Sequence, residues 1–228
     1  MSGGAGHGRG ETMRLTVPVT ALCAVLIALA FTATGSARQR VWRVAAESGF
    51  EAKADYCRTC HGLSGEGYRG YYPMPRLAGQ QPKYIENQLR AFIERRRVNP
   101  VMFNVAHALS PAMLEALTQY FYQLNPPPIG GAAGGNLGLG RTIYEEGLPE
   151  ANIAACSACH GPEAKGHEEI PRLAGQLYPY TVKALSSWTR ERGQGAGKSD
   201  ASAIMVPTTH NLNSAQISAL AAYLSTLR

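Results

Sequence analysis

Cysteine is scarce in this chain, with five in 228 residues. Four of the five belong to two short runs that resemble each other, and the fifth, Cys23, lies in an apolar segment near the N-terminus. No pair is therefore left over for a structural disulfide. This excludes a fold held together by such bonds and removes the usual compositional marker of an oxidising compartment. Because Cys23 follows Leu22 instead of a small residue, it is not expected to carry a lipid.

Long apolar runs are lacking after residue 33, and the single such run covers residues 15–33. Arg9 and Arg14 precede it, and small residues up to Ala37 follow it. A basic start, an apolar stretch and a small-residue cleavage site are typical of a secretory signal, here residues 1–37. Because the run is close to the length of a membrane span, an uncleaved N-terminal membrane anchor is the alternative. Either segment exports the chain, so nucleic acid is not an expected partner.

The four remaining cysteines form a motif that occurs twice, Cys-x-x-Cys-His, which is the attachment signature of a c-type haem. Two thiols one helical turn apart can each add to a vinyl group of one porphyrin, and the adjacent histidine then serves as the proximal ligand of the iron. The sequence therefore predicts two covalently attached c-type haems. Their cysteines and proximal histidines are Cys57, Cys60 and His61 for the first haem, and Cys156, Cys159 and His160 for the second.

Two other kinds of site also use closely spaced cysteines. A thioredoxin-like redox pair would need a strand–helix setting and does not call for the histidine. A zinc site would need a further ligand at metal-finger spacing, and no cysteine follows Cys159 to supply it. Since each explanation would have to hold twice, the doubled motif favours haem over zinc or dithiol chemistry.

A second repeat, the six-residue run PRLAGQ, follows each haem motif. Pro75 and Pro171 each offer a carbonyl oxygen that can accept a hydrogen bond from the proximal histidine ring, fixing its tautomer and orientation. Arg76 and Arg172 are candidates for pairing with the haem propionates, because a guanidinium group gives forked donors to a carboxylate. An ordinary turn with a surface arginine is the alternative.

Apolar residues recur at helical spacing on both sides of each haem motif, which predicts an all-α fold. Ser110 and Asn213 are expected to cap the last helix of each half. These last helices are expected to pack across the first helix of their own half. Helices are predicted to run from about residue 44 into the first motif, from Pro82, after Ser110, from Leu137 to Gly147 and after Asn213.

The duplication divides the chain into two tandem cytochrome c-like helical domains, residues 38–125 and residues 137–228. Between them, residues 126–136 are rich in proline and glycine and form a linker. A domain of this size is near the lower limit of what a side-chain core stabilises alone. A covalently bound haem would therefore make up a large share of each core.

A haem iron held by its proximal histidine has one further axial position, and its occupant distinguishes electron transfer from ligand chemistry. Met102 and Met205 are the best candidates, each expected in a loop seven residues before a leucine that precedes the last helix. A thioether ligand raises the reduction potential. His107 and His210 lie five residues further on, at matching positions, and are the alternative ligands.

From about Arg38 to Arg228 the chain resembles the dihaem cytochrome c4 family. The doubled CxxCHG motif, the doubled PRLAGQ run and the late methionine of each half carry the resemblance. It implies class I cytochrome c domains with His/Met iron, in a periplasmic electron carrier that is not an enzyme. It also implies a membrane quinol-oxidising complex as donor and a terminal oxidase as acceptor. The chain departs from the family in its long linker and in a first-half loop that is three residues longer.

Two other functions are alternatives to that of a free carrier. The same domains could form the electron-transfer subunit of a larger dehydrogenase or oxidase complex. A dihaem enzyme such as a peroxidase needs one iron with an open or replaceable position, and the paired methionines argue against it.

Positive charge is concentrated in the first half of the mature chain. Residues 38–125 hold 12 Lys and Arg against 7 Asp and Glu, whereas residues 138–228 hold 8 against 8. Such a field steers association, so the first half would present a docking face to an acidic redox partner. Solubility is the alternative explanation of the same charge.

Overall fold

The computed structural model of this chain describes residues 1–4, 49–130, 135–192 and 201–228. Apart from its first four residues, the predicted signal or anchor at 1–37 lies outside them. The chain divides into a unit Met1–Gly49 and a unit Phe50–Arg228, and the second contains both haem motifs. Within the described stretches, no helix combines the length and the apolar character that crossing a membrane requires.

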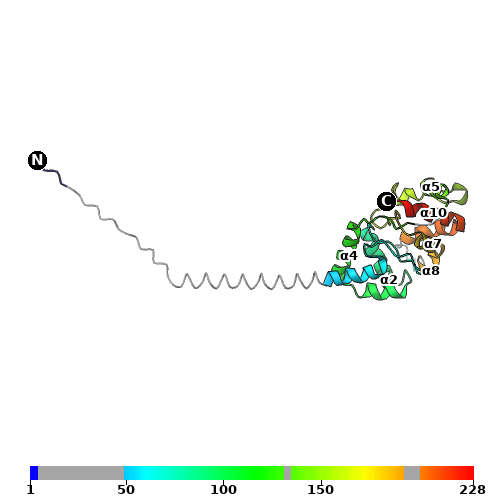
Figure 1. The fold of residues 1–228 in the computed structure, drawn as a ribbon, viewed down its shortest axis with the longest axis horizontal. Helices are drawn as coiled ribbons and strands as arrows, with labels where there is room; N and C mark the ends of the chain where they lie inside the picture. The colour runs from blue at the N-terminus through cyan, green and yellow to red at the C-terminus, as the bar shows by residue number, and fades with distance from the viewer. Residues whose placement is uncertain (5–48, 131–134, 193–200) are drawn as a thin grey trace. The chain divides into compact units, whose positions relative to one another are not determined.

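Helices make up the regular structure of the described part of Phe50–Arg228, as the all-α prediction expects (Figure 1). Three isolated antiparallel bridges close loops between them. Two short 3-10 turns, η1 and η2, lie at Pro149–Ala151 and Ala201–Ile204. The helices are an unlabelled one at residues 49–61, α2 Pro82–Ile93, α3 Pro100–His107, α4 Pro111–Gln123, α5 Leu137–Glu145, α6 Ser157–His160, α7 Tyr178–Ser186, α8 Trp188–Glu191, α9 Met205–Asn211 and α10 Ser214–Thr226.

Local signals set the starts of the last helix in each half. The Ser110 side chain accepts a hydrogen bond from the Met113 N–H, and a proline occupies the first turn of α4. At α10, Asn213 and Gln216 form a reciprocal capping box. Both helices therefore begin where the sequence predicted.

The loops predicted around the two candidate methionine ligands are wrong, because both segments are helical. Met102 lies in the first turn of α3, and Met205 is the first residue of α9. At α3 the Asn99 side chain accepts from the Met102 N–H, and Pro100 stands at the first helical position. This Asn-Pro start signal is the physical reason that the segment around Met102 forms a helix and not a loop.

The first half has its own apolar core, formed where the helix at residues 49–61 meets α2, α3 and α4. The apolar face predicted for α2 is buried there, and Phe50 packs edge-on against Tyr120 with ring centroids 5.6 Å apart. The last helix of this half therefore contacts its first, as expected. The buried members are Ala54, Ile85, Leu89, Phe92, Ala106, Leu114, Leu117 and Phe121.

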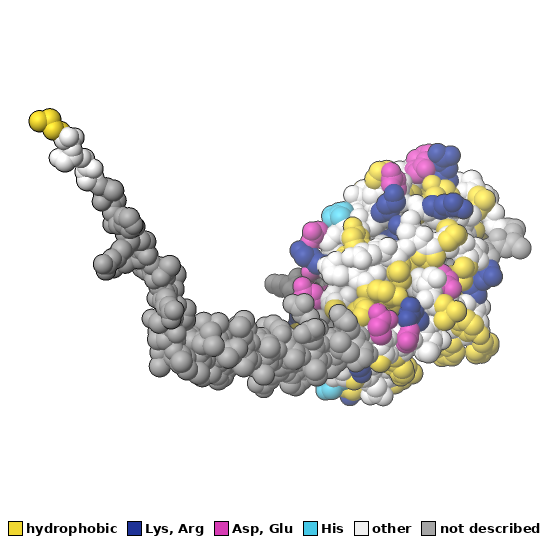
Figure 2. All heavy atoms as spheres, turned by 60° about the vertical axis from the view of Figure 1, so that its left-hand side comes forward, with side chains coloured by type: hydrophobic (Ala, Val, Ile, Leu, Met, Phe, Trp, Pro, Cys, Tyr) yellow, Lys and Arg dark blue, Asp and Glu magenta, His cyan; other side chains and the backbone are white. Residues whose placement is uncertain are grey.

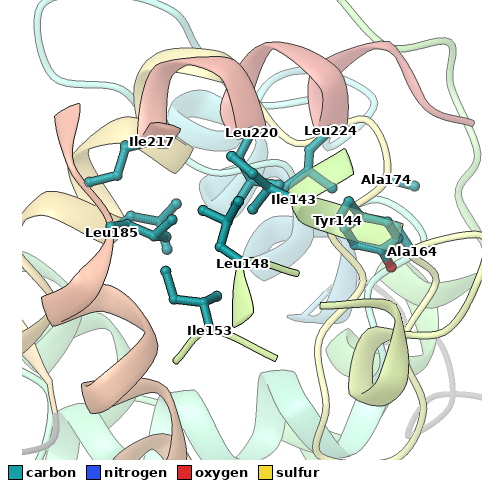
Figure 3. Packing of buried hydrophobic residues seen from close by; sticks show 11 residues of the cluster. Ile143, Tyr144, Leu148, Ile153, Ala164, Ala174, Leu185, Ile217, Leu220 and Leu224 are labelled. Atoms are coloured by element: carbon teal, nitrogen blue, oxygen red, sulfur yellow. The ribbon is translucent and has the colours of Figure 1, made fainter. Parts of the chain in front are cut away.

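The second half repeats this arrangement with α5 and α10, which lie side by side in Figure 1. Figure 3 shows Ile143 of α5 pointing toward Leu220 and Leu224 of α10, with Leu185 of α7 beside them. Gly140 allows the close approach, because a Cβ atom there would lie 2.2 Å from the Ala219 carbonyl oxygen. The predicted crossing of first and last helices is thus present in this half too.

The proline-rich start of the linker lies against both halves. The Arg76 guanidinium donates to the carbonyl oxygen of Pro126 at 2.8 Å and contacts that of Pro127 at 3.5 Å. A Cβ atom on Gly175 would touch the Pro128 ring at 3.3 Å. Residues 131–134 of the glycine-rich remainder lie outside the described residues.

Surface charges of both signs occur together on the face drawn in Figure 2, where basic and acidic side chains neighbour one another. Several pairs lie one helical turn apart, such as Arg90 with Glu86 at 2.7 Å and Arg141 with Glu145 at 3.0 Å. Exposed pairs of this kind contribute little to stability. Their effect is to balance charge locally.

Candidate haem sites

The proximal histidine of the first motif is held by the chain itself. His61 is the last residue of the helix at 49–61, is 8% exposed, and has its Nδ1 2.9 Å from the Pro75 carbonyl oxygen. Burial lowers the pKa of His61, and the positive charge of Arg97 lowers it further, against the opposing effect of the Pro75 carbonyl. A neutral ring that donates from Nδ1 leaves the Nε2 lone pair for a metal.

The second motif repeats this geometry. His160 ends α6, is 6% exposed, and has its Nδ1 3.0 Å from the Pro171 carbonyl oxygen. Burial lowers the pKa of His160 as well. The role predicted for each proline thus matches a hydrogen bond in each half.

The motif cysteines stand one helical turn apart in both halves, and all four are free thiols. Cys57 and Cys156 are half-buried against their respective cores, whereas Cys60 and Cys159 are exposed. Burial raises the pKa of the Cys57 thiol and raises that of Cys156 to about 11. Each pair therefore offers two free thiols with no bond between them.

The two candidate methionine ligands are half-buried, and each packs against the apolar core of its own half. The alternative ligands, His107 and His210, lie near the C-terminal ends of the same short helices and are exposed. The His107 ring packs on Phe103, with centroids 5.4 Å apart. Burial beside the core therefore favours Met102 and Met205 over His107 and His210 as inward-facing ligands.

The arginines of the two PRLAGQ runs are buried, and their guanidinium groups bond to backbone. Arg76 Nε donates to the Ala78 carbonyl oxygen at 3.0 Å, and Arg172 Nε donates to that of Ala174 at 3.0 Å. Burial, helped by the charge of Arg172, lowers the pKa of Arg76 to about 10. Arg76 and Arg172 thus hold the backbone of their own loops, a role that the sequence did not predict.

A cationic cluster where the two halves meet was also missed. Arg97 and Arg192 each donate to the Tyr180 hydroxyl at 2.8 Å, and Arg192 also reaches the Tyr84 hydroxyl at 3.3 Å. Burial opposes ionisation of the phenol, but the two guanidinium charges outweigh it and lower the pKa of Tyr180 to about 8. In the sequence, the run Arg95-Arg96-Arg97 is explained by the favourable effect of positive charge at the C-terminal end of a helix. The contact of Arg97 with Tyr180 was therefore not predicted.

The side chains present fit a covalently bound haem in each half. Each site supplies two unpaired thiols, a neutral imidazole with a free Nε2 and a half-buried thioether. Soft sulfur and imidazole ligands are those that bind haem iron in cytochromes. Among the described residues, no group of three or more His, Cys, Asp or Glu side chains is placed to hold a metal ion.

Known proteins give the same picture. The cytochrome c family model matches residues 139–228. The chain is 33% identical to cytochrome c-552 of Acidithiobacillus ferridurans, covering 85% of this chain and 82% of that one. It is 35% identical to cytochrome c4 of Thiocapsa roseopersicina, over 78% and 90% of the two chains. It is 36% identical to a thiosulfate dehydrogenase electron acceptor of Thiomonas intermedia, over 76% and 79%.

Solved structures agree with these relatives. The cytochrome c4 of Acidithiobacillus ferrooxidans superposes with a TM-score of 0.64 at 33% identity, covering 75% of this chain and 98% of that one. A thiosulfate dehydrogenase from Marichromatium purpuratum matches with a TM-score of 0.66 at 32% identity, over 75% of this chain but only 36% of the other.

Proposed function

Because the chain belongs to the cytochrome c4 family of dihaem c-type cytochromes, we propose that it carries electrons from a membrane quinol-oxidising complex toward a terminal oxidase. The family identifies it as an electron carrier with two covalent haems, and not as an enzyme. We also propose that it acts in the periplasm, where the signal or anchor predicted at residues 1–37 would deliver it.

The observation that carries this proposal is that both proximal histidines are held by the same kind of hydrogen bond to a proline carbonyl. Each Nδ1 lies 2.9 or 3.0 Å from the carbonyl oxygen of the proline that opens the PRLAGQ run. We assign Cys57, Cys60, His61 and Met102 to the haem of residues 38–125. The haem of residues 137–228 is assigned Cys156, Cys159, His160 and Met205.

When bound, each haem supplies a one-electron iron couple. The chain's own residues do the rest. The proline carbonyls hold the imidazole rings in one tautomer, and burial keeps those rings neutral. Met102 and Met205 would supply a thioether ligand to each iron, so that the bound haem would exchange electrons and would not bind small substrates.

Haem propionates need cationic partners, and the chain offers two sets. Arg76 and Arg172 are the predicted pair, and Arg76 also holds the linker through its Nη2. Arg97 and Arg192 are the second pair, which share one tyrosine hydroxyl. Two guanidinium groups around a single phenol leave donors suited to carboxylates, so we favour this second pair as propionate partners.

A second function, favoured by the matches to thiosulfate dehydrogenase proteins, is that of the electron-transfer partner of a thiosulfate-oxidising dehydrogenase. One relative at 36% identity is a thiosulfate dehydrogenase electron acceptor, and a solved thiosulfate dehydrogenase contains a segment of the same fold. In that case the dehydrogenase takes the place of the quinol-oxidising complex as donor.

Electron exchange by the exported, mature protein tests these proposals. A pyridine haemochrome assay should give two covalent haems per chain, and mass analysis should locate the mature N-terminus near residue 38. Stopped-flow reduction should be fast with a quinol-oxidising complex, and the reduced protein should be reoxidised by a terminal oxidase. Fast reduction by thiosulfate dehydrogenase alone would favour the second function. Prompt carbon monoxide binding to the reduced protein would contradict closed axial sites in both halves.

A further inference from the structure

Two buried glutamines, the last residues of the repeated runs, reach across from one half to the other. The Gln176 side chain accepts from the Arg76 N–H at 2.8 Å and donates to the Arg76 carbonyl oxygen at 3.2 Å. Reciprocally, the Gln80 side chain accepts from the Arg172 N–H at 2.7 Å and donates to the Arg172 carbonyl oxygen at 3.0 Å. Each half therefore holds the other by an amide that pairs with one backbone residue.

The peptide group that each glutamine holds is the same one that supports the proximal histidine. The Arg76 N–H belongs to the peptide unit whose oxygen is that of Pro75, and that oxygen lies 2.9 Å from His61 Nδ1. A continuous chain thus runs from the His61 ring through one peptide to Gln176 of the other half. The mirror chain runs from His160 through the Pro171 carbonyl to Gln80.

The acceptor atoms of these chains are themselves held in place. Gln80 Oε1 also accepts from the Gln81 N–H at 2.9 Å, and Gln176 Oε1 accepts from the Leu177 N–H at 3.0 Å. Both bonds lie at the starts of α2 and α7. Both glutamines are less than 10% exposed, at 4% and 8%. Water therefore competes little for these bonds.

Hydrogen bonds in such a chain polarise one another. An N–H that donates to a glutamine oxygen leaves its peptide carbonyl a stronger acceptor. A stronger acceptor at Nδ1 makes the imidazole a better electron donor to its iron, and hydrogen bonding around the ligands is one of the protein's means of setting a haem potential. A more electron-rich iron favours the oxidised state, so the potential falls.

We propose that Gln80 and Gln176 are positioning residues that act across the interface, each lowering the reduction potential of the haem in the opposite half. This rests on the assignment of His61 and His160 as proximal ligands. Each potential is then set in full only when the two halves are paired, and the electron equilibrium between the haems depends on the interface.

The test is a crossed comparison in the full dihaem protein. Gln176→Leu removes the acceptor of the Arg76 N–H and should raise the potential of the haem on Cys57 and Cys60. Gln80→Leu should raise that of the other haem. We expect the equilibrium constant for electron exchange between the two haems to change at least twofold. At 59 mV per tenfold change, this corresponds to a change of about 18 mV in the difference between the two potentials. The two variants should shift it in opposite directions, as read by spectroelectrochemistry with haems assigned by paramagnetic NMR.

Gln81→Leu is the matched control, because the Gln81 side chain also crosses the interface but bonds elsewhere. Its Nε2 donates to the carbonyl oxygens of Lys165 and Gly166 at 3.0 and 3.3 Å. This variant should leave both potentials unchanged. Gln176→Glu keeps an acceptor oxygen in place and should not raise the opposite potential.

Three results would overturn the inference: equal shifts at both haems, a shift only in the variant's own half, or a Gln81→Leu effect as large as that of Gln176→Leu. If a leucine variant fails to mature, Gln176→Asn and Gln80→Asn make the same comparison, since their side chains are one methylene too short. Loss of haem or of histidine ligation in the unchanged protein would instead contradict the proposed function.

Discussion

At the scale of single residues, the two sites depend on which side chains face each core and which face solvent. His61 and His160 are nearly buried, and each ring is oriented by its hydrogen bond to a proline carbonyl. Met102 and Met205 are half-buried beside their cores, and the neighbouring histidines are exposed. Residue placement thus supports His/Met ligation in both halves.

Replacing Met102 tests that ligation. Met102→Leu should abolish the thioether charge-transfer band of the first haem and lower its potential, because the ligand that raises the potential is removed. The second haem should keep both properties. Optical titration during stepwise reduction measures the two together.

Met113→Leu is the control for this change, because Met113 packs against the same apolar core but belongs to α4. A Met-to-Leu exchange conserves most of the core volume and costs less than about 1.5 kcal/mol. If Met113→Leu removed the band, or if Met102→Leu preserved it, the assignment of Met102 would be wrong.

At the scale of helices, short sequence signals predict where elements start better than they predict what surrounds a ligand. Ser110-Pro111 and Asn213 mark α4 and α10 correctly. The eight-residue α3 and seven-residue α9 were missed, because so short a helix shows too few turns for apolar periodicity. Asn99-Pro100 was the available signal for α3. The sequence offers no comparable side-chain cap for α9.

The cap of α3 should matter for the iron ligand, since Asn99 Oδ1 accepts from the N–H of Met102 itself at 2.9 Å. Asn99→Ala should cost about 0.5–2 kcal/mol in the free energy of unfolding. It should also make the first-half methionine easier to displace, because the turn that presents it frays. Titration with imidazole, followed at the thioether band, measures the displacement.

Ser110→Ala provides the comparison, because Ser110 caps α4 by the same kind of bond at 3.2 Å but holds no ligand. It should lower stability by a similar amount and leave imidazole binding unchanged. Equal imidazole affinity in the two variants would show that the α3 cap does not position Met102.

The contact of α5 with α10 gives a second test at this scale. Gly140→Ala would place a Cβ atom 2.2 Å from the backbone oxygen of Ala219, so the helices must separate. We expect a loss of about 1–3 kcal/mol in stability. Gly138→Ala, on the same helix, meets only an ordinary 3.5 Å contact and should gain about 0.5–1 kcal/mol. Denaturant unfolding of the second-half haem signal should separate the two variants, and equal effects would contradict this packing.

At the scale of the whole molecule, motif repeats predicted two haem-binding halves but not the contacts that join them. The cysteine and histidine spacing is local, so both attachment sites could be identified from the chain alone. Gln80 and Arg172 lie 92 residues apart, and neither carries a local signal that names the other. Arg97 likewise acquires its role only when folding brings Tyr180 beside it.

The cluster formed by Arg97, Tyr180 and Arg192 should couple the halves in unfolding. Tyr180→Phe removes the hydroxyl that accepts from both guanidinium groups, one from each half, and leaves partly buried donors without that partner. We expect the free energy of unfolding to fall by about 1–3 kcal/mol, as reported by the haem signals of both halves.

Tyr178→Phe is the matched control, because its hydroxyl contacts only Ser218 of its own half, at 2.8 Å. Both halves should lose stability together in Tyr180→Phe, whereas Tyr178→Phe should affect the second half alone. Denaturant titrations that follow each haem separately would show this, and a Tyr180→Phe effect confined to one half would mean that the cluster does not join the two domains.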